Sequence, residues 1–185
     1  MAKKTVTSWK SKKLYILQAP DNFDKKEIGT TLSADPEKLA GRTVQVSLGD
    51  LMNDRSKNYL NLRFEVYDVK GDKALTRFKK FFIPTGYLRS KVRKKTLKID
   101  YGREMEVEGD MMRFKIMVLS RHKVSEVQKA DIKKSITRIL EKHTDSRDKV
   151  LQAALFGKLG TEIYKDIKKI CPVTRVEVYQ IEMLR

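Results

Sequence analysis

The residues best suited to recognise a ligand are the lysines and arginines of one run, from Arg77 to Ile99. This run contains no Asp or Glu, so nothing within it neutralises the positive charge. Its cations are Arg77, Lys79, Lys80, Arg89, Lys91, Arg93, Lys94, Lys95 and Lys98. A polyanion is the ligand that most simply relieves such a surplus. The run therefore predicts contact with phosphate groups.

Aromatic side chains lie among these cations. Phe81, Phe82 and Tyr87 are interleaved with the basic residues, and guanidinium groups beside aromatic faces suit phosphates and unstacked bases. A lysine-rich helix face is usually just solvated, and we favour that interpretation for the helix predicted after Gly157. For the run from Arg77 to Ile99 we favour contact with RNA.

A second basic segment occupies residues 1–13, where Trp9 is the only large apolar side chain. Such a segment buries too little apolar surface to order itself, so we expect a flexible arm until a partner binds. Trp9 could stack on a base or pack on the folded domain, and the sequence leaves both open. Lys10, Lys12 and Lys13 are candidate RNA contacts.

Composition supports the same interpretation. The chain has 185 residues, a formal charge of +17 and 40% hydrophobic residues, so it can bury a core while remaining strongly cationic. The single cysteine, Cys171, cannot form an internal disulfide and is expected to be an inert thiol in a reducing compartment. No secretory signal or membrane-spanning segment is recognisable, so we expect a soluble, cytoplasmic protein.

Motifs for catalysis or metal binding are weak. His122 and His143 have no second ligand at zinc-site spacing, and the residues around Gly157 lack the rest of a phosphate-binding loop. The one acidic patch consists of Glu104, Glu106, Glu108 and Asp110. A metal or acid–base role for it is conceivable, but a solvated strand face is favoured. We therefore expect no enzyme activity, no metal and no cofactor.

The elements that must position these residues are mainly strands in the first two-thirds of the chain. Apolar residues alternate over 43–48 and 59–69, and Gly71-Asp72 predicts a hairpin to 73–83. Gly109-Asp110 predicts a second hairpin, joining 103–108 to 111–119. So many successive strands would leave exposed edges, which favours an antiparallel, barrel-like sheet.

Helical patterns follow the strands. Residues 84–95 predict a short basic helix or turn, and Ser125 with Gln128 forms a capping box before an amphipathic helix. Further helices are expected from Ser146 to Phe156 and from about Leu159 to Cys171, just before Pro172. The predicted class is α+β. A basic arm (1–13) precedes a single RNA-binding domain (14–185), which is strand-rich over 14–120, helical over 121–171 and ends in a strand over 173–183.

Several short strings carry a family resemblance. The strongest lie at 156–159, 162–165, 168–170, 172 and 175–178, and weaker ones at 19–23, 28–29, 39–42, 50–51, 88–95 and 99–100. With so many matches in the same order, the chain resembles the S3Ae family of archaeal and eukaryotic small-subunit ribosomal proteins, from Leu14 to Arg185.

The resemblance implies a β-barrel with packed helices, bound to ribosomal RNA (rRNA) on the small-subunit platform near the mRNA exit, without catalysis. The matching basic positions are Arg42, Arg89, Arg93, Lys94, Lys95 and Lys158. The long C-terminal extension of eukaryotic members is lacking, which indicates an archaeal-type protein. The residues from Lys79 to Phe82 replace a Gly-His-containing segment usual in the family, which leaves local contacts there open.

Together these observations predict a structural constituent of the small ribosomal subunit, present in one copy and not as a homo-oligomer. Expected partners are small-subunit rRNA and neighbouring ribosomal proteins. Contact with mRNA near the exit and with initiation factors is possible from the resemblance, and no membrane association is expected. One alternative is an autonomous regulatory module that binds single-stranded RNA outside the ribosome; an RNA-processing enzyme is the least favoured. The predicted rRNA contacts are Lys10, Lys12, Lys13, Arg42, Lys79, Lys80, Arg89, Lys91, Arg93, Lys94, Lys95, Lys98 and Lys158.

Overall fold

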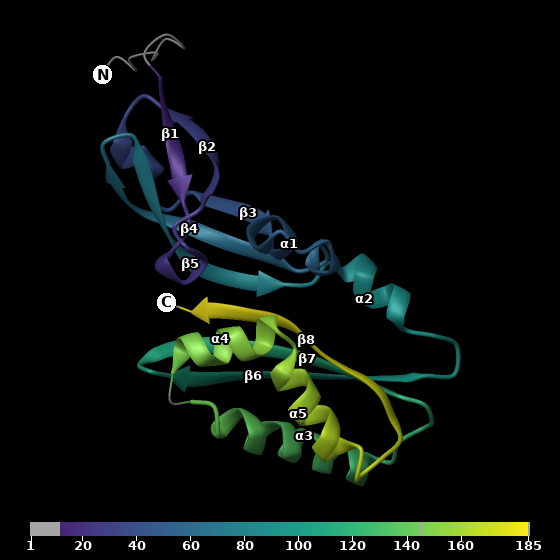
Figure 1. Cartoon of the computed structure of the whole chain (residues 1–185). Coiled ribbons are helices and arrows are strands. Elements are labelled where there is room, and N and C mark those ends of the chain that lie inside the picture. The colour runs from purple at the N-terminus through teal and green to yellow at the C-terminus, as the bar shows by residue number, and fades with distance from the viewer. Residues whose placement is uncertain (1–11, 145, 185) are drawn as a thin grey trace, which may run out of the picture. The chain divides into compact units, whose positions relative to one another are not determined.

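The computed structural model describes residues 12–144 and 146–184. The chain divides into two compact units, Met1–Lys79 and Lys80–Arg185, called here the first and second unit (Figure 1). Most of the predicted basic arm, including Trp9 and Lys10, lies outside the described residues. Lys13 is the first residue of a strand. A single domain from 14 to 185 stays a prediction.

Strands form most of the first unit: β1 (Lys13–Gln18), β2 (Glu27–Ser33), β3 (Thr43–Ser47), β4 (Asn61–Lys70) and β5 (Lys73–Phe82), whose last three residues belong to the second unit. The pairing order is β2-β1-β5-β4-β3, and β1 and β5 are parallel. Short helices connect these strands: η2 (Asp21–Phe23), η3 (Pro36–Leu39), α1 (Leu48–Met52) and η4 (Arg55–Lys57). The core comprises Tyr15, Leu17, Leu39, Val66 and Ala74.

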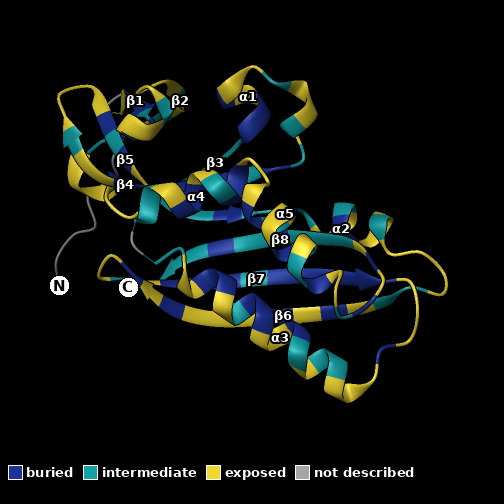
Figure 2. Ribbon diagram, turned by 60° about the horizontal axis from the view of Figure 1, so that its bottom comes forward, coloured by how far each residue is buried: buried dark blue, intermediate teal, exposed yellow. Residues whose placement is uncertain are grey.

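The second unit is an antiparallel sheet with helices on one face. Its strands are the end of β5, then β8 (Val173–Leu184), β7 (Asp110–Ser120) and β6 (Leu97–Val107). Helix α2 (Thr85–Lys91) precedes β6. Helices α3 (Glu126–Glu141), α4 (Arg147–Leu155) and α5 (Lys158–Ile167) cover the sheet, with their buried sides toward it (Figure 2).

Helix α5 lies directly against strand β8. Leu159, Ile163 and Ile167 recur at helical spacing and are fully buried. A Cβ added at Gly160 would lie 3.4 Å from the carbonyl oxygen of Val176 on β8, which is van der Waals contact. The backbone of α5 at Gly160 therefore lies close to the backbone of β8.

A carboxylate on α5 ties this helix to α3. Asp166 accepts hydrogen bonds from Ser135 and from Arg138, the latter at 2.6 Å between Nη2 and Oδ2. These two donors hold the pKa of the Asp166 carboxyl below its ordinary value, outweighing desolvation. The contribution to stability is present above the ordinary Asp pKa of about 3.9 and is lost as the pH falls through the lower, folded-state value.

The predicted α+β class is confirmed, with the larger helices in the C-terminal part. The capping box at Ser125 and Gln128 is also confirmed, with N···O distances of 3.3 and 3.1 Å. In the described ranges the sheet is open, because the strand order ends at β2, β3 and β6, so closure into a barrel is not found. The sheet is mixed because β1 pairs in parallel with β5, a long-range pairing that local patterns do not encode.

One boundary error affects the interpretation of the site. The sequence predicts a strand beginning at Arg103, but β6 begins at Leu97, so the β6–β7 hairpin is six residues longer on that side.

Within the part of the chain that the structure describes, no helix is long and apolar enough to span a membrane.

Replacing Ile163 by Ala should lower the free energy of unfolding by about 2–5 kcal/mol, because it leaves a cavity between α5 and the sheet. Guanidinium unfolding followed by circular dichroism measures the change. Val127→Ala is the matched control, since Val127 is 72% exposed on α3 and should change stability by about 0.5 kcal/mol or less. Equal losses in the two variants would contradict the packing described here.

Candidate nucleic-acid interface

The cations between Arg77 and Ile99 differ in whether the fold already uses their charge. On β5, Arg77 Nη2 lies 3.2 Å from Glu65 Oε2, and Lys79 Nζ lies 3.3 Å from Glu65 Oε1. The Glu65 side chain on β4 is only 6% exposed. A carboxylate buried to that degree requires compensating charge. Arg77 and Lys79 therefore stabilise the β4–β5 pair within the first unit.

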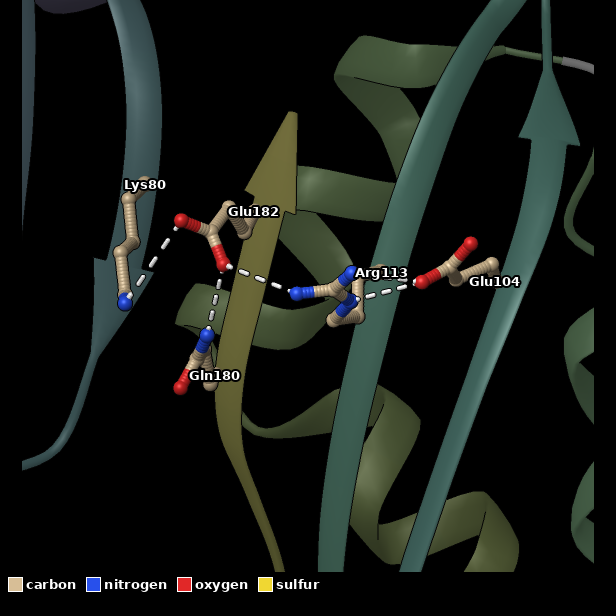
Figure 3. Close-up of polar contacts among 5 residues, drawn as sticks. All are labelled: Lys80, Glu104, Arg113, Gln180 and Glu182. Atoms are coloured by element: carbon tan, nitrogen blue, oxygen red, sulfur yellow. Dashed lines mark hydrogen bonds and ion pairs between the residues drawn. The ribbon is translucent and has the colours of Figure 1, made fainter. Parts of the chain in front are cut away.

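Lys80 belongs to a row of alternating charges across the second unit's sheet (Figure 3). Lys80 Nζ lies 3.8 Å from Glu182 Oε1 on β8, whose other carboxylate oxygen lies 4.0 Å from Arg113 Nη1 on β7. Arg113 Nη2 in turn donates to Glu104 Oε1 on β6 at 2.6 Å. Gln180 Nε2 donates to Glu182 at 2.9 Å. Opposite charges in cross-strand positions stabilise the pairing of these strands.

Two further cations of the run have local partners. Lys98 Nζ lies 2.7 Å from Asp100 Oδ2, its neighbour two residues along β6. Lys91 Nζ lies 4.5 Å from the centre of the Tyr87 ring, a cation–π contact on α2. The expectation that Phe81 could face RNA bases is wrong, because Phe81 is 1% exposed and belongs to the core.

Four cations of the run remain: Arg89, Arg93, Lys94 and Lys95. Arg89 lies in the last turn of α2, and the other three lie in the loop between α2 and β6. All four are exposed, and among residues 12–144 and 146–184 the structure gives their side chains no polar partner. Their charge is therefore available to a ligand.

The other predicted contacts lie elsewhere. Arg42 is exposed, but its Nη1 donates to Thr31 Oγ1 at 2.9 Å and to the Leu32 carbonyl at 3.0 Å, so it supports β2. Lys12 and Lys13 are exposed at the start of β1, and Lys158 is exposed at the first turn of α5. Lys10 lies outside the described residues.

The acidic patch has a structural role. Glu108 Oε2 accepts a hydrogen bond from the backbone N–H of Arg147 at 2.9 Å, and Arg147 Nη1 lies 2.9 Å from Asp110 Oδ2. These contacts attach the first residue of α4 to the β6–β7 turn, where a carboxylate also complements the helix dipole. In the described part of the chain, no three His, Cys, Asp or Glu residues are grouped to hold a metal ion.

Cys171 is buried just before β8. Burial raises the pKa of its thiol, although a hydrogen bond with Ser120 opposes the shift. The thiolate is therefore disfavoured, which is the environment of an unreactive cysteine.

Sequence reasoning missed three exposed cations near the loop that carries Arg93: Arg121 and Lys123 after β7, and Lys168 after α5. Strand register brings these loops together, because Leu97 at the start of β6 pairs with Ser120, and Ser120 pairs with Val173. Apolar residues alternate from Leu97 to Val107, which indicates that the strand begins at Leu97. Because the predicted strand begins at Arg103, the sequence analysis did not place these loops at adjacent strand ends.

The whole chain, residues 1–185, matches the model of the Ribosomal S3Ae family. The chain belongs to this family. Three archaeal relatives carry the name small ribosomal subunit protein eS1. The protein of Methanobrevibacter smithii is 33% identical over 96% of this chain and 93% of its own length. That of Sulfurisphaera tokodaii is 36% identical over 96% and 93%, and that of Archaeoglobus fulgidus 38% over 95% and 86%.

The two kinds of cation in this S3Ae-family chain should respond differently to neutral replacement. Lys79→Met should lower the free energy of unfolding by about 1–3 kcal/mol, because Glu65 loses one of its charged donors. Lys94→Met should change it by about 0.5 kcal/mol or less, since Lys94 is exposed and without a described partner. Urea unfolding measures both. A Lys94 variant as unstable as the Lys79 variant would contradict the assignment.

Proposed function

We propose that this chain is a structural constituent of the small ribosomal subunit, with no catalytic role. It binds rRNA on the platform near the mRNA exit, one copy per subunit, in the cytoplasm. The observation that carries the proposal is the family match over residues 1–185, with relatives named as small ribosomal subunit proteins. The net charge of +17 is consistent with an rRNA partner.

The proposed contacts fall into two classes. Arg89, Arg93, Lys94 and Lys95 bind phosphates, because they are exposed and have no described partner. Lys79 and Lys80 first stabilise the fold and can add only a secondary contribution, since carboxylates already compensate them. Phosphate contacts supply affinity, whereas the shape of the RNA and its unpaired bases supply placement. Neighbouring ribosomal proteins are further partners, and mRNA and initiation factors are candidates.

Binding of the full chain to a transcript of small-subunit rRNA should depend steeply on salt. If six to ten phosphates are engaged, affinity should fall by roughly 10³ to 10⁵ between 50 and 200 mM salt, because each contact releases counterions. Filter binding or fluorescence anisotropy over a salt series measures this slope. A flat response, or a chain absent from purified small subunits in a native mass measurement, would contradict the proposal.

Replacing Arg89, Arg93, Lys94 and Lys95 together by Ala should impair incorporation into small subunits without unfolding the chain. If each contacts one phosphate, the salt slope of RNA binding should decrease by about 3–4. Sedimentation of subunits assembled with the variant measures incorporation, and circular dichroism checks the fold. The matched control replaces four other exposed lysines by Ala: Lys70, Lys73, Lys142 and Lys149. Unchanged incorporation of the first variant would refute the role of these cations.

A further inference from the structure

Three loops of the second unit meet at one end of its sheet. The start of β6, the end of β7 and the start of β8 are adjacent, because Leu97 pairs with Ser120 and Ser120 with Val173. Each strand end joins a loop: residues 92–96, 121–125 and 168–172, respectively. The loops lie at the right-hand end of β6, β7 and β8 in Figure 1. We call this region the basic end.

Hydrogen bonds fix the shape of these loops. The backbone N–H of Arg121 donates to the carbonyl of Pro172 at 3.0 Å, and Ser120 Oγ donates to the carbonyls of His122 and Pro172 at 3.0 and 3.3 Å. In the loop of residues 92–96, Thr96 Oγ1 donates to the Arg93 carbonyl at 2.7 Å. Backbone that is ordered before binding lowers the entropic cost of association.

The basic end has a charge composition unlike the rest of the second unit. Its three loops contain no Asp or Glu. Their cations, all exposed, are Arg93, Lys94, Lys95, Arg121, Lys123, Lys168 and Lys169. Lys169 lies 3.6 Å from Asp166, whereas the described residues provide no polar partner for the other six side chains.

The contrast with neighbouring parts of the same unit is informative. On the helices, Arg138 pairs with Asp166 and Lys129 with Glu126, as is usual for a solvated helix surface. At the opposite end of β6 and β7 lie Glu106, Glu108 and Asp110. A strand of eleven residues separates the two ends by about 35 Å. The sheet therefore has a cationic end and an opposite end that carries these carboxylates, of which Glu108 and Asp110 contact Arg147. We call the latter the acidic end.

We propose that the basic end is one composite binding site for the RNA phosphate backbone, in which Arg121, Lys123 and Lys168 act together with Arg93, Lys94 and Lys95. The inference rests on the proposed function and extends it to a site that combines three loops distant in sequence. Six exposed cations on loops that follow adjacent strand ends, none with a described polar partner, repel one another, and the phosphates of an RNA backbone relieve that repulsion. The acidic end is then directed away from the RNA backbone.

Replacing Arg121, Lys123 and Lys168 together by Ala in the full chain tests the site, with a transcript of small-subunit rRNA as the probe. If each residue contacts one phosphate, the salt slope should decrease by about 2–3, and affinity at 0.1 M salt should fall roughly 10²-fold. The difference should vanish as the salt approaches about 1 M. A charge-preserving variant, Arg121→Lys with Lys123→Arg and Lys168→Arg, should restore most of the affinity.

The matched control replaces three exposed lysines of α3, the following turn and α4, Lys133, Lys142 and Lys149, by Ala. It removes the same charge from the same unit and should bind more tightly than the triple variant. Equal loss in both variants, or wild-type binding by the triple variant, would overturn the composite site while leaving the proposed function intact. A wild-type chain that fails to bind the transcript would overturn the proposed function, and this inference with it. Thermal unfolding of each variant excludes loss of fold as the cause.

Discussion

Positive charge in excess of what the fold can pair is the constraint on which this structure depends. Some cations form ion pairs with specific carboxylates. Glu65 pairs with Arg77 and Lys79, and Glu182 pairs with Lys80 and Arg113. These cations lie on strands, where register places opposite charges side by side. Within the run from Arg77 to Ile99, the cations without a described partner lie on α2 and on the loop after it, where no strand register supplies a partner. In this run, the strand cations stabilise the fold, and the others are the proposed RNA contacts.

The long antiparallel register of β6, β7 and β8 converts sequence distance into spatial proximity. Residues before position 97, after 120 and before 173 become neighbours because three strands end together. Helices α3, α4 and α5 pack on one face of this sheet through their buried apolar residues (Figure 2). An ion pair between Asp166 and Arg138 also joins α5 to α3. The rigid part of the second unit thus presents loops at its ends, as is common for binding sites.

Local chemistry was predictable from the sequence. The Ser125–Gln128 capping box and the hairpin turns follow from short-range rules, and the structure contains them. The helix expected to stop at Cys171, before Pro172, ends earlier, at Ile167. The family was also recognisable from spaced motifs. The parallel pairing of β1 with β5 was not predictable, because it joins segments more than fifty residues apart without a local signal.

The candidate site shows the same limit. The surplus of charge between Arg77 and Ile99 is visible in the sequence, but its division into compensated and free cations depends on partners such as Glu65 and Glu182 in other strands. Phe81 looked available for stacking because alternation does not reveal which face of a strand becomes the core. Arg121 and Lys123 were overlooked because their neighbours come from the other end of a long hairpin.

The open edge of β6 has a consequence for the chain before it meets its partner. An unpaired strand of this length is a template for joining further copies through backbone hydrogen bonds. Here the solvent-facing positions Lys98, Asp100, Glu104 and Glu106 are all charged. Ionised groups along an edge oppose the dry stacking that fibrous aggregation requires. The charged residues of β6 thereby oppose edge-to-edge pairing between copies of the newly synthesised chain.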